Sequence, residues 1–363
     1  MKNKQKVNKI VDLIGFFSLN LQRIIQNIKV MKKICVYKRL ILFGMIVVSV
    51  CSCFSACTID AGMKATSLHA ENVISKLGDS IFLSKQISCI DSRKDTIYIS
   101  DYHAGVYSLD RNLKLIKKVS SIGLGQGEVN RPAKLFMSDN GIALFNEGTQ
   151  KYSYFSGTSF LKNDSKAISN NLACASRFFT KGDSVYQSII NDQKLVVITR
   201  DGITIKKICP VVKGIDDADN PALSERHLVK GSKSFYVIGL GLPIIQEYSF
   251  EGSELARFDL SSIPLLTNAY EKSRKNKVPN SYYVIVNDAY YKNDKIFLLT
   301  SLYEDDYKCN TLIVLKALDG CLQYLTSYSL QKDVYSTFCI NDKNECYAVC
   351  SMNGTIEVYQ LPI

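Results

Sequence analysis

The chain reads Ile87-Ser-Cys-Ile90, Thr96-Ile-Tyr-Ile-Ser100, Gly105-Val-Tyr-Ser-Leu109 and Leu113-Lys-Leu-Ile-Lys-Lys-Val119 in one continuous stretch. Short runs of alternating or β-branched apolar residues, separated by turn residues, are typical of β-strands. The turn Asp110-Arg111-Asn112 joins the last two runs. We therefore expect an antiparallel meander with one strand for each of these runs.

The same pattern returns along the chain, and a turn that contains glycine follows the third strand of most units. Glycine supplies the positive φ that a tight hairpin turn needs. The units begin near Ile87, Lys134, Ala173, Arg226, Tyr283 and Tyr335. A four-stranded repeat of about 40 to 50 residues is typical of β-propellers. The sequence thus predicts an all-β fold, a six-bladed β-propeller with four antiparallel strands per blade.

The last unit lacks one strand. It supplies Tyr335–Ile340, Glu345–Cys350 and Thr355–Gln360 before the sequence stops, whereas the apolar segment 72–77 precedes the first unit without a partner. We expect this N-terminal strand to complete the last blade and close the ring, because the pairing removes exposed strand edges.

Two segments, 261–281 and 304–310, are expected as insertions. We find no convincing stretch of helical period, so the basic run Lys272, Arg274, Lys275 and Lys277 is expected in an exposed loop.

The formal net charge of +11 would suit a nucleic-acid partner, but its location argues against one. Ten lysines and arginines stand against Asp12 within residues 1–40, and the apolar and uncharged stretch 41–57 follows. The rest of the chain is nearly neutral. With 46% hydrophobic and 22% charged residues the composition is that of a packed globular protein. We expect no nucleic-acid partner.

The basic N-terminal region is typical of an export signal. From Met31 a basic segment, the apolar run 40–50 and a cysteine-rich end of small residues follow in the order of a secretory signal. The apolar run is shorter than the roughly 20 residues of a membrane span. Phe54-Ser-Ala-Cys57 resembles a bacterial lipobox, so Cys57 is the expected lipidation site and Cys53 the alternative. An ordinary cleaved signal or an uncleaved anchor helix are the other interpretations.

This pattern predicts the organisation of the whole chain. We expect a leader over residues 1–57, with the signal peptide and lipobox in 31–57, a tether over 58–70 and the propeller over 71–363. Residues 1–30 are explained by a misassigned start codon or by a cytoplasmic extension. The protein is expected to be exported and lipid-anchored to the bacterial envelope, at the outer membrane rather than the inner one.

Eight cysteines lie beyond the leader: Cys89, Cys174, Cys209, Cys309, Cys321, Cys339, Cys346 and Cys350. Export permits disulfides, and two of these cysteines, at 339 and 346, would face each other across a tight hairpin. We favour buried free thiols. The sequence contains no Cys-x-x-Cys pair, which argues against a zinc ribbon or a thioredoxin-type redox site.

One connection carries a family resemblance. Gly123-Leu-Gly-Gln-Gly127-Glu-Val-Asn-Arg-Pro132 follows the first unit and resembles the Gly-x-Gly-x-Gly-Glu-x-x-x-Pro connection of six-bladed propeller lipoproteins of Bacteroides-type bacteria. Those lipoproteins are similar to NHL and TolB-like propellers. The resemblance covers about residues 70–363 and implies that this segment connects blades. The spacing of its glycines differs from a dinucleotide fingerprint.

The resemblance also suggests a metal site to test for, because some NHL-like propellers hold zinc with histidines at the central axis. His69 falls in the N-terminal tail, which leaves His103 and His227 as weak candidates. Two widely separated histidines are a poor metal signal. We therefore expect no metal, no cofactor and no catalytic residue.

The function expected from the sequence is that of a binding or interaction module. Its ligand would be an unknown envelope protein, peptide or glycan, and its membrane contact a lipid anchor. The alternative is a propeller-type enzyme, such as a metal-dependent lyase or a lactonase-like enzyme, that works in the central funnel. Convergence of His103, His227 and carboxylates at one mouth of the channel would favour the enzyme.

Overall fold

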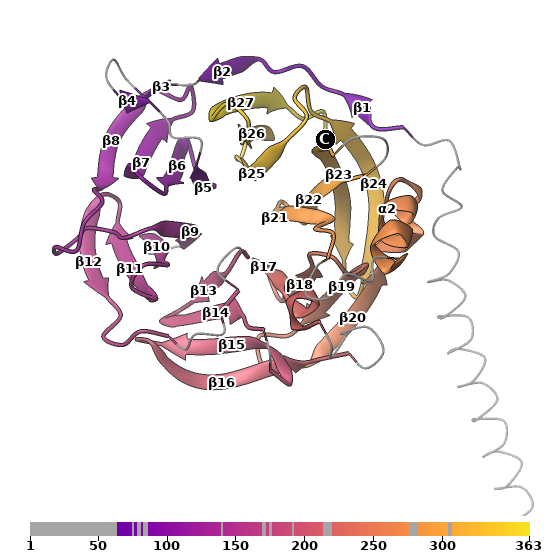
Figure 1. Ribbon diagram of the computed structural model, residues 1–363, viewed down its shortest axis with the longest axis horizontal. Helices are drawn as coiled ribbons and strands as arrows, with labels where there is room; N and C mark the ends of the chain where they lie inside the picture. Colours follow the sequence, from indigo (N-terminus) through magenta and orange to yellow (C-terminus); the bar gives the residue numbers. More distant parts are fainter. Residues whose placement is uncertain are drawn as a thin grey trace, which may run out of the picture. The chain divides into compact units, whose positions relative to one another are not determined.

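The computed structural model describes residues 64–74, 76–77, 81–82, 86–138, 141–168, 172–173, 176–190, 192–212, 220–275, 282–303 and 307–363. Six antiparallel sheets stand around a central axis in this part of the chain, as Figure 1 shows. The predicted six-bladed β-propeller is confirmed. The expected leader, with Cys57 and Cys53, lies outside the described residues.

In each of the first three blades the strands follow one another in sequence, from the axis outward. Blade one contains β5 (Ile87–Arg93), β6 (Thr96–Asp101), β7 (Gly105–Asp110) and β8 (Leu115–Ser120). Blade two contains β9 (Pro132–Ser138), β10 (Gly141–Asn146), β11 (Lys151–Ser156) and β12 (Ser159–Asn163). Blade three contains β13 (Phe179–Lys181), β14 (Ser184–Ser188), β15 (Lys194–Arg200) and β16 (Ile203–Pro210).

The last three blades repeat this order, with additions from the N-terminal segment. Blade four contains β17 (Arg226–Lys230), β18 (Phe235–Gly239), β19 (Ile244–Tyr248) and β20 (Glu254–Asp259). Blade five contains β21 (Val286–Lys292), β22 (Lys295–Ser301), β23 (Cys309–Leu318) and β24 (Cys321–Ser329). Blade six contains β25 (Tyr335–Ile340), β26 (Glu345–Cys350) and β27 (Thr355–Gln360).

The N-terminal segment closes the ring, as predicted. Strand β2 (Asn72–Ile74) pairs antiparallel with β27 and becomes the fourth strand of blade six. The closing strand ends earlier than expected, because β3 (Lys76–Leu77) turns away to pair with β4 (Ile81–Phe82). Strand β1 (Thr66–Ser67), in the expected tether, pairs in parallel with β24 on the outside of blade five.

The glycine turns have the backbone that the hairpins require. Gly157, Gly202, Gly252 and Gly320 all have positive φ, between 58° and 95°. Each follows the third strand of its blade, where the chain reverses toward the outer strand. The expected glycine turn between the third and fourth strands is therefore present in blades two to five.

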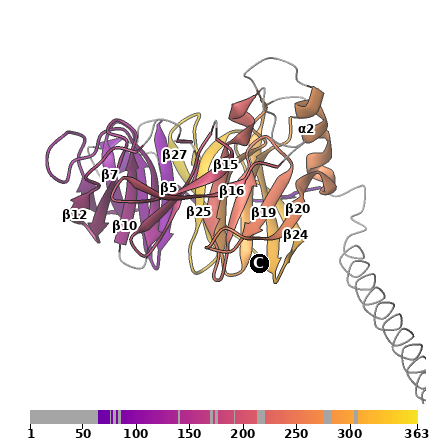
Figure 2. The same cartoon turned by 90° about the horizontal axis from the view of Figure 1, so that it is seen from below.

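The insertion after β20 is helical, so the expectation of a loop is wrong. After η2 (Leu260–Ser262), helix α2 (Pro264–Lys275) lies beside blades four and five, where Figure 2 shows it at the rim of the ring. Leu266, Ala269 and Tyr270 form its buried face, and proline is well suited to a first helical position. A further short helix, η1 (Pro221–Ser224), precedes β17.

Three members of the expected basic loop, Lys272, Arg274 and Lys275, occupy the last turn of α2, where cations stabilise the negative end of the helix dipole. Lys277 lies outside the described residues. No helix of the described part is long and apolar enough to cross a membrane.

The core lies between neighbouring blades, and the cysteines contribute to it as free thiols, as favoured from the sequence. Cys346 pairs in register with Ile340, and Cys339 with Tyr347, so the two cysteines do not face each other. Burial raises the pKa of both thiols. The free cysteines of the described part are Cys89, Cys209, Cys309, Cys321, Cys339, Cys346 and Cys350.

Candidate binding site at the mouth of the central channel

The glycine-rich connection between blades one and two is held by hydrogen bonds among its own residues. The Glu128 carboxylate accepts a hydrogen bond from the Gly125 N–H at 2.7 Å, and the N–H of Gly123 donates to the Val129 carbonyl at 3.0 Å. A side chain at Gly123 would collide with the Glu128 carboxylate. These contacts fix the shape of the turn that connects the two blades.

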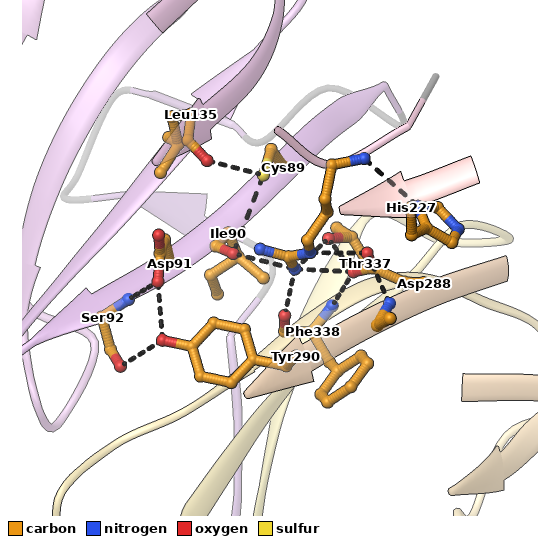
Figure 3. A network of polar contacts seen from close by, with 12 residues as sticks. Cys89, Ile90, Asp91, Ser92, Leu135, His227, Asp288, Tyr290, Thr337 and Phe338 are labelled. Atoms are coloured by element: carbon orange, nitrogen blue, oxygen red, sulfur yellow. Dashed lines mark hydrogen bonds and ion pairs between the residues drawn. The ribbon is translucent and has the colours of Figure 1, made fainter. Parts of the chain in front are cut away.

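A buried arginine connects four blades at the centre of the ring. Arg177 precedes β13, and its guanidinium donates to the two carboxylate oxygens of Asp288 on β21, at 2.6 and 2.7 Å. The same group donates to the carbonyl of Phe338 on β25 at 2.5 Å and to that of Ile90 on β5 at 3.4 Å. Figure 3 shows Asp288, Phe338 and Ile90 around this point. The side chain of Arg177 thus joins the innermost strands of blades one, five and six to the segment that leads into blade three.

The partner of this arginine is held ionised. Asp288 is fully buried, and its carboxylate also accepts from the Thr337 hydroxyl at 2.7 Å and the Phe338 N–H at 3.0 Å. Burial alone would raise the pKa of Asp288, but the charge and the hydrogen bonds of Arg177 hold it well below its usual value. The bidentate pair is therefore charged in the folded protein.

A second buried carboxylate lies next to this pair. Asp91, on β5, accepts hydrogen bonds from the Tyr290 hydroxyl at 2.6 Å, the Met137 N–H at 2.9 Å and the Ser92 N–H at 2.8 Å. Burial raises the pKa of Asp91 even though Arg177 lowers it. The Tyr290 ring lies 5.2 Å from the guanidinium carbon of Arg177, in cation–π range. These residues form one connected network.

The histidines proposed as weak metal candidates are not brought into one cluster. His227, on β17, is fully buried, and its Nδ1 accepts from the backbone N–H of Arg177 at 3.2 Å. Burial lowers the pKa of His227 to about 4. His103 is exposed in the turn between β6 and β7 of blade one, and His69 is exposed near β1. Among the described residues, no group of three or more histidine, cysteine, aspartate or glutamate side chains is placed to hold a metal ion.

One mouth of the channel opens into a pocket of about 410 Å³. Its walls come from the ends of β5, β9, β17 and β21 and from Asp342 in the turn after β25. Arg177 and Tyr290 belong both to the lining and to the buried network, so the network forms the inner end of the pocket. The lining combines apolar side chains with cationic ones, the latter being Arg93, Lys94, Arg177, Lys230 and Lys292.

Sequence reasoning did not find this site. Arg177 stands in a connection before a short strand, where an arginine usually faces solvent, and its partner follows 111 residues later. The available signal is a carboxylate in the middle of an innermost strand, which occurs at Asp91 in β5 and at Asp288 in β21. Buried carboxylates require partners, so these two positions could have indicated a polar centre.

Neither a protein-family model nor a curated protein matches the sequence. Among solved structures, a Bacteroides fragilis protein described as exported has a TM-score of 0.52 at 13% identity, over 82% of this chain and 98% of that one. Streptogramin B lyase has a TM-score of 0.48 at 12% sequence identity, over 79% of this chain and 97% of that one. BamB from Moraxella catarrhalis has a TM-score of 0.41 at 8% sequence identity, over 85% of this chain and 98% of that one. At these identities the likeness concerns the propeller fold alone.

Proposed function

We propose that the protein is an exported binding module of the bacterial envelope, anchored by a lipid on Cys57, or on Cys53 as the alternative, and that it binds its ligand in the pocket at the channel mouth. The order of basic, apolar and cysteine-containing segments supports export and anchoring. The glycine-rich connection Gly123–Pro132 supports kinship with Bacteroides-type propeller lipoproteins.

The observation that carries the binding role is the pocket itself, closed at its inner end by the Arg177 network. Its volume of about 410 Å³ lies in the range of small-molecule sites. A small molecule, or the end of a peptide or glycan, fits this space.

Blocking the mouth tests the proposal. Ser232 is exposed at the pocket rim, so Ser232→Trp should fill the entrance without disturbing the core. Ser121→Trp, at another exposed position, on the connection between β8 and β9, is the matched control. Full-length chains are incubated with small-molecule extracts of bacterial envelopes, and retained compounds are identified by mass spectrometry. Compounds retained by the wild type and the control should be lost in Ser232→Trp, whereas equal retention, or none by any chain, would refute the pocket as the binding site.

The lipid anchor is tested separately. Growth with an alkyne fatty acid should label the wild-type chain, and Cys57→Ala should abolish the label. Labelling that persists in Cys57→Ala and disappears in Cys53→Ala would move the anchor to the alternative cysteine. Absence of label from the wild-type chain would refute lipidation.

A further inference from the structure

The charged residues in the pocket lining are unequal in number. Five cationic side chains line it, contributed by blades one, three, four and five, against two carboxyl groups, Asp91 and Asp342. A concave site lined mainly by one sign of charge concentrates ions of the other sign, because its low-dielectric walls focus the field.

The acidic groups at this mouth already have partners. Asp342 forms an ion pair with Lys292 at 2.5 Å, and Asp91 accepts the three buried hydrogen bonds described above. In the adjoining turns, Asp95 lies 3.8 Å from the Lys343 ammonium, and Asp294 accepts from the Tyr291 hydroxyl at 2.7 Å. A cationic ligand would have to displace one of these partners. An anionic ligand held by Lys94 and Lys230 would leave both the Arg177–Asp288 pair and the Lys292–Asp342 pair in place.

The rest of the lining is apolar or aromatic. Phe136, Phe178, Leu228 and Tyr290 contribute to the walls. A fully hydrated inorganic ion would leave this surface in contact with water, whereas an apolar group placed against it would gain about 25 cal/mol for each Å² removed from water. The pocket therefore suits a molecule with two different parts.

We propose that the ligand of this pocket is an organic anion, with a phosphate, sulfate or carboxylate group held among Lys94, Lys230 and the neighbouring cations and an apolar or aromatic body against the phenylalanine and tyrosine walls. This inference rests on the proposed binding role of the pocket. It assigns the chemical class of the ligand, which that role leaves open.

Isothermal titration calorimetry of the full-length chain tests the assignment with matched probes. Phenyl phosphate carries both features, inorganic phosphate the anion alone, benzyl alcohol the neutral ring, and benzyltrimethylammonium the ring with a positive charge. Phenyl phosphate should bind about ten-fold more tightly than each of the others, which corresponds to about 1.4 kcal/mol. Equal or stronger binding of the neutral or the cationic probe would overturn the assignment.

Charge reversal then locates the bound anion. Lys230→Glu, within the lining, should weaken phenyl phosphate by about ten-fold or more, and added salt should weaken wild-type binding. The matched control is Lys233→Glu, on the same hairpin but outside the lining, with its side chain 84% exposed; it should change the affinity by less than about two-fold. Lys94→Glu, on the exposed turn after β5, repeats the test should Lys230→Glu fail to fold.

The outcomes separate this inference from the proposed function. If Ser232→Trp abolishes retention of an envelope compound that is neutral or cationic, the pocket binds a ligand and the anion assignment is wrong. If phenyl phosphate binds wild type, Lys230→Glu and Lys94→Glu equally, it does not bind in this pocket and the assignment is again wrong. If Ser232→Trp blocks neither envelope compounds nor phenyl phosphate, the proposed function fails as well.

Discussion

Replacing Arg177 by methionine is the most informative single change in the ring. The variant Arg177→Met keeps much of the side-chain volume but removes both hydrogen bonds to Asp288 and the contacts with the carbonyls of Phe338 and Ile90. The Asp288 carboxylate then stays fully buried, with the Thr337 hydroxyl and backbone N–H groups as its remaining donors.

The expected loss of unfolding free energy follows from this uncompensated charge. Breaking a buried ion pair by removing one partner costs about 3–5 kcal/mol of unfolding free energy. Asp288→Asn should cost a similar amount, because it leaves the Arg177 charge without its counter-ion. The double variant removes both charges, and its amide oxygen can still accept from the Phe338 N–H. We therefore expect the double variant to lose about 2 kcal/mol less than the sum of the single variants.

Urea unfolding followed by circular dichroism measures all four chains at pH 7. The destabilisation by Arg177→Met should shrink as the pH falls. In the wild type, the pKa of Asp288 is held low, so its stabilisation is complete above the unfolded pKa of about 3.9 and is lost as the pH falls toward the folded value. Without Arg177, burial raises that pKa, and protonation relieves the unpaired charge. Additive losses that do not depend on pH would refute the account of the network.

Three further predictions concern other parts of the ring. His227 has a folded pKa of about 4, below the unfolded value of about 6.5, so wild-type stability should fall as the pH drops between these values, by up to about 1.4 kcal/mol per pH unit. Urea unfolding curves of His227→Gln, measured at the same pH values, should lack this pH-dependent loss. Gly141→Ala should lower the free energy of unfolding by about 3 kcal/mol or more, because φ is +142° and the new Cβ would lie 1.9 Å from the Phe155 carbonyl oxygen. Gly157→Ala, with φ +58° and open space around the new Cβ, should lower it by about 1 kcal/mol. Equal losses of stability in the two variants would contradict this prediction. Deleting residues 1–75 should expose the edge of β27 and lower Tm by about 5 °C or more relative to deletion of residues 1–63. Equal Tm values of the two deletion variants in calorimetry would show that β2 does not stabilise the closed ring.

The blades could be predicted because the information for them is local. Each hairpin is encoded by alternating residues and a nearby turn, and the missing strand of blade six pointed to the N-terminal segment that became β2. Helix α2 was missed because three buried residues, Leu266, Ala269 and Tyr270, leave a weak periodic signal in a short segment.

Register and the polar centre were beyond the sequence for different reasons. Five residues separate the paired Ile340 and Cys346, and one of them, Asn344, has φ +61°. A connection one residue shorter would have placed Cys346 opposite Cys339. The Arg177–Asp288 pair depends on closure of the whole ring, because it joins residues of blades three and five. No local pattern encodes such a contact.

Hydrogen–deuterium exchange of the full-length chain, with and without saturating phenyl phosphate, tests the binding site most directly. The account predicts slower exchange at Arg93–Lys94, Gly231–Ser232 and Tyr291–Lys292, the strand ends that line the mouth. The hairpins between second and third strands, such as Tyr102–Ala104, lie at the opposite ends of the strands and should be unchanged. Protection of those opposite hairpins, or no protection anywhere, would contradict the claim that ligand enters the pocket closed by Arg177.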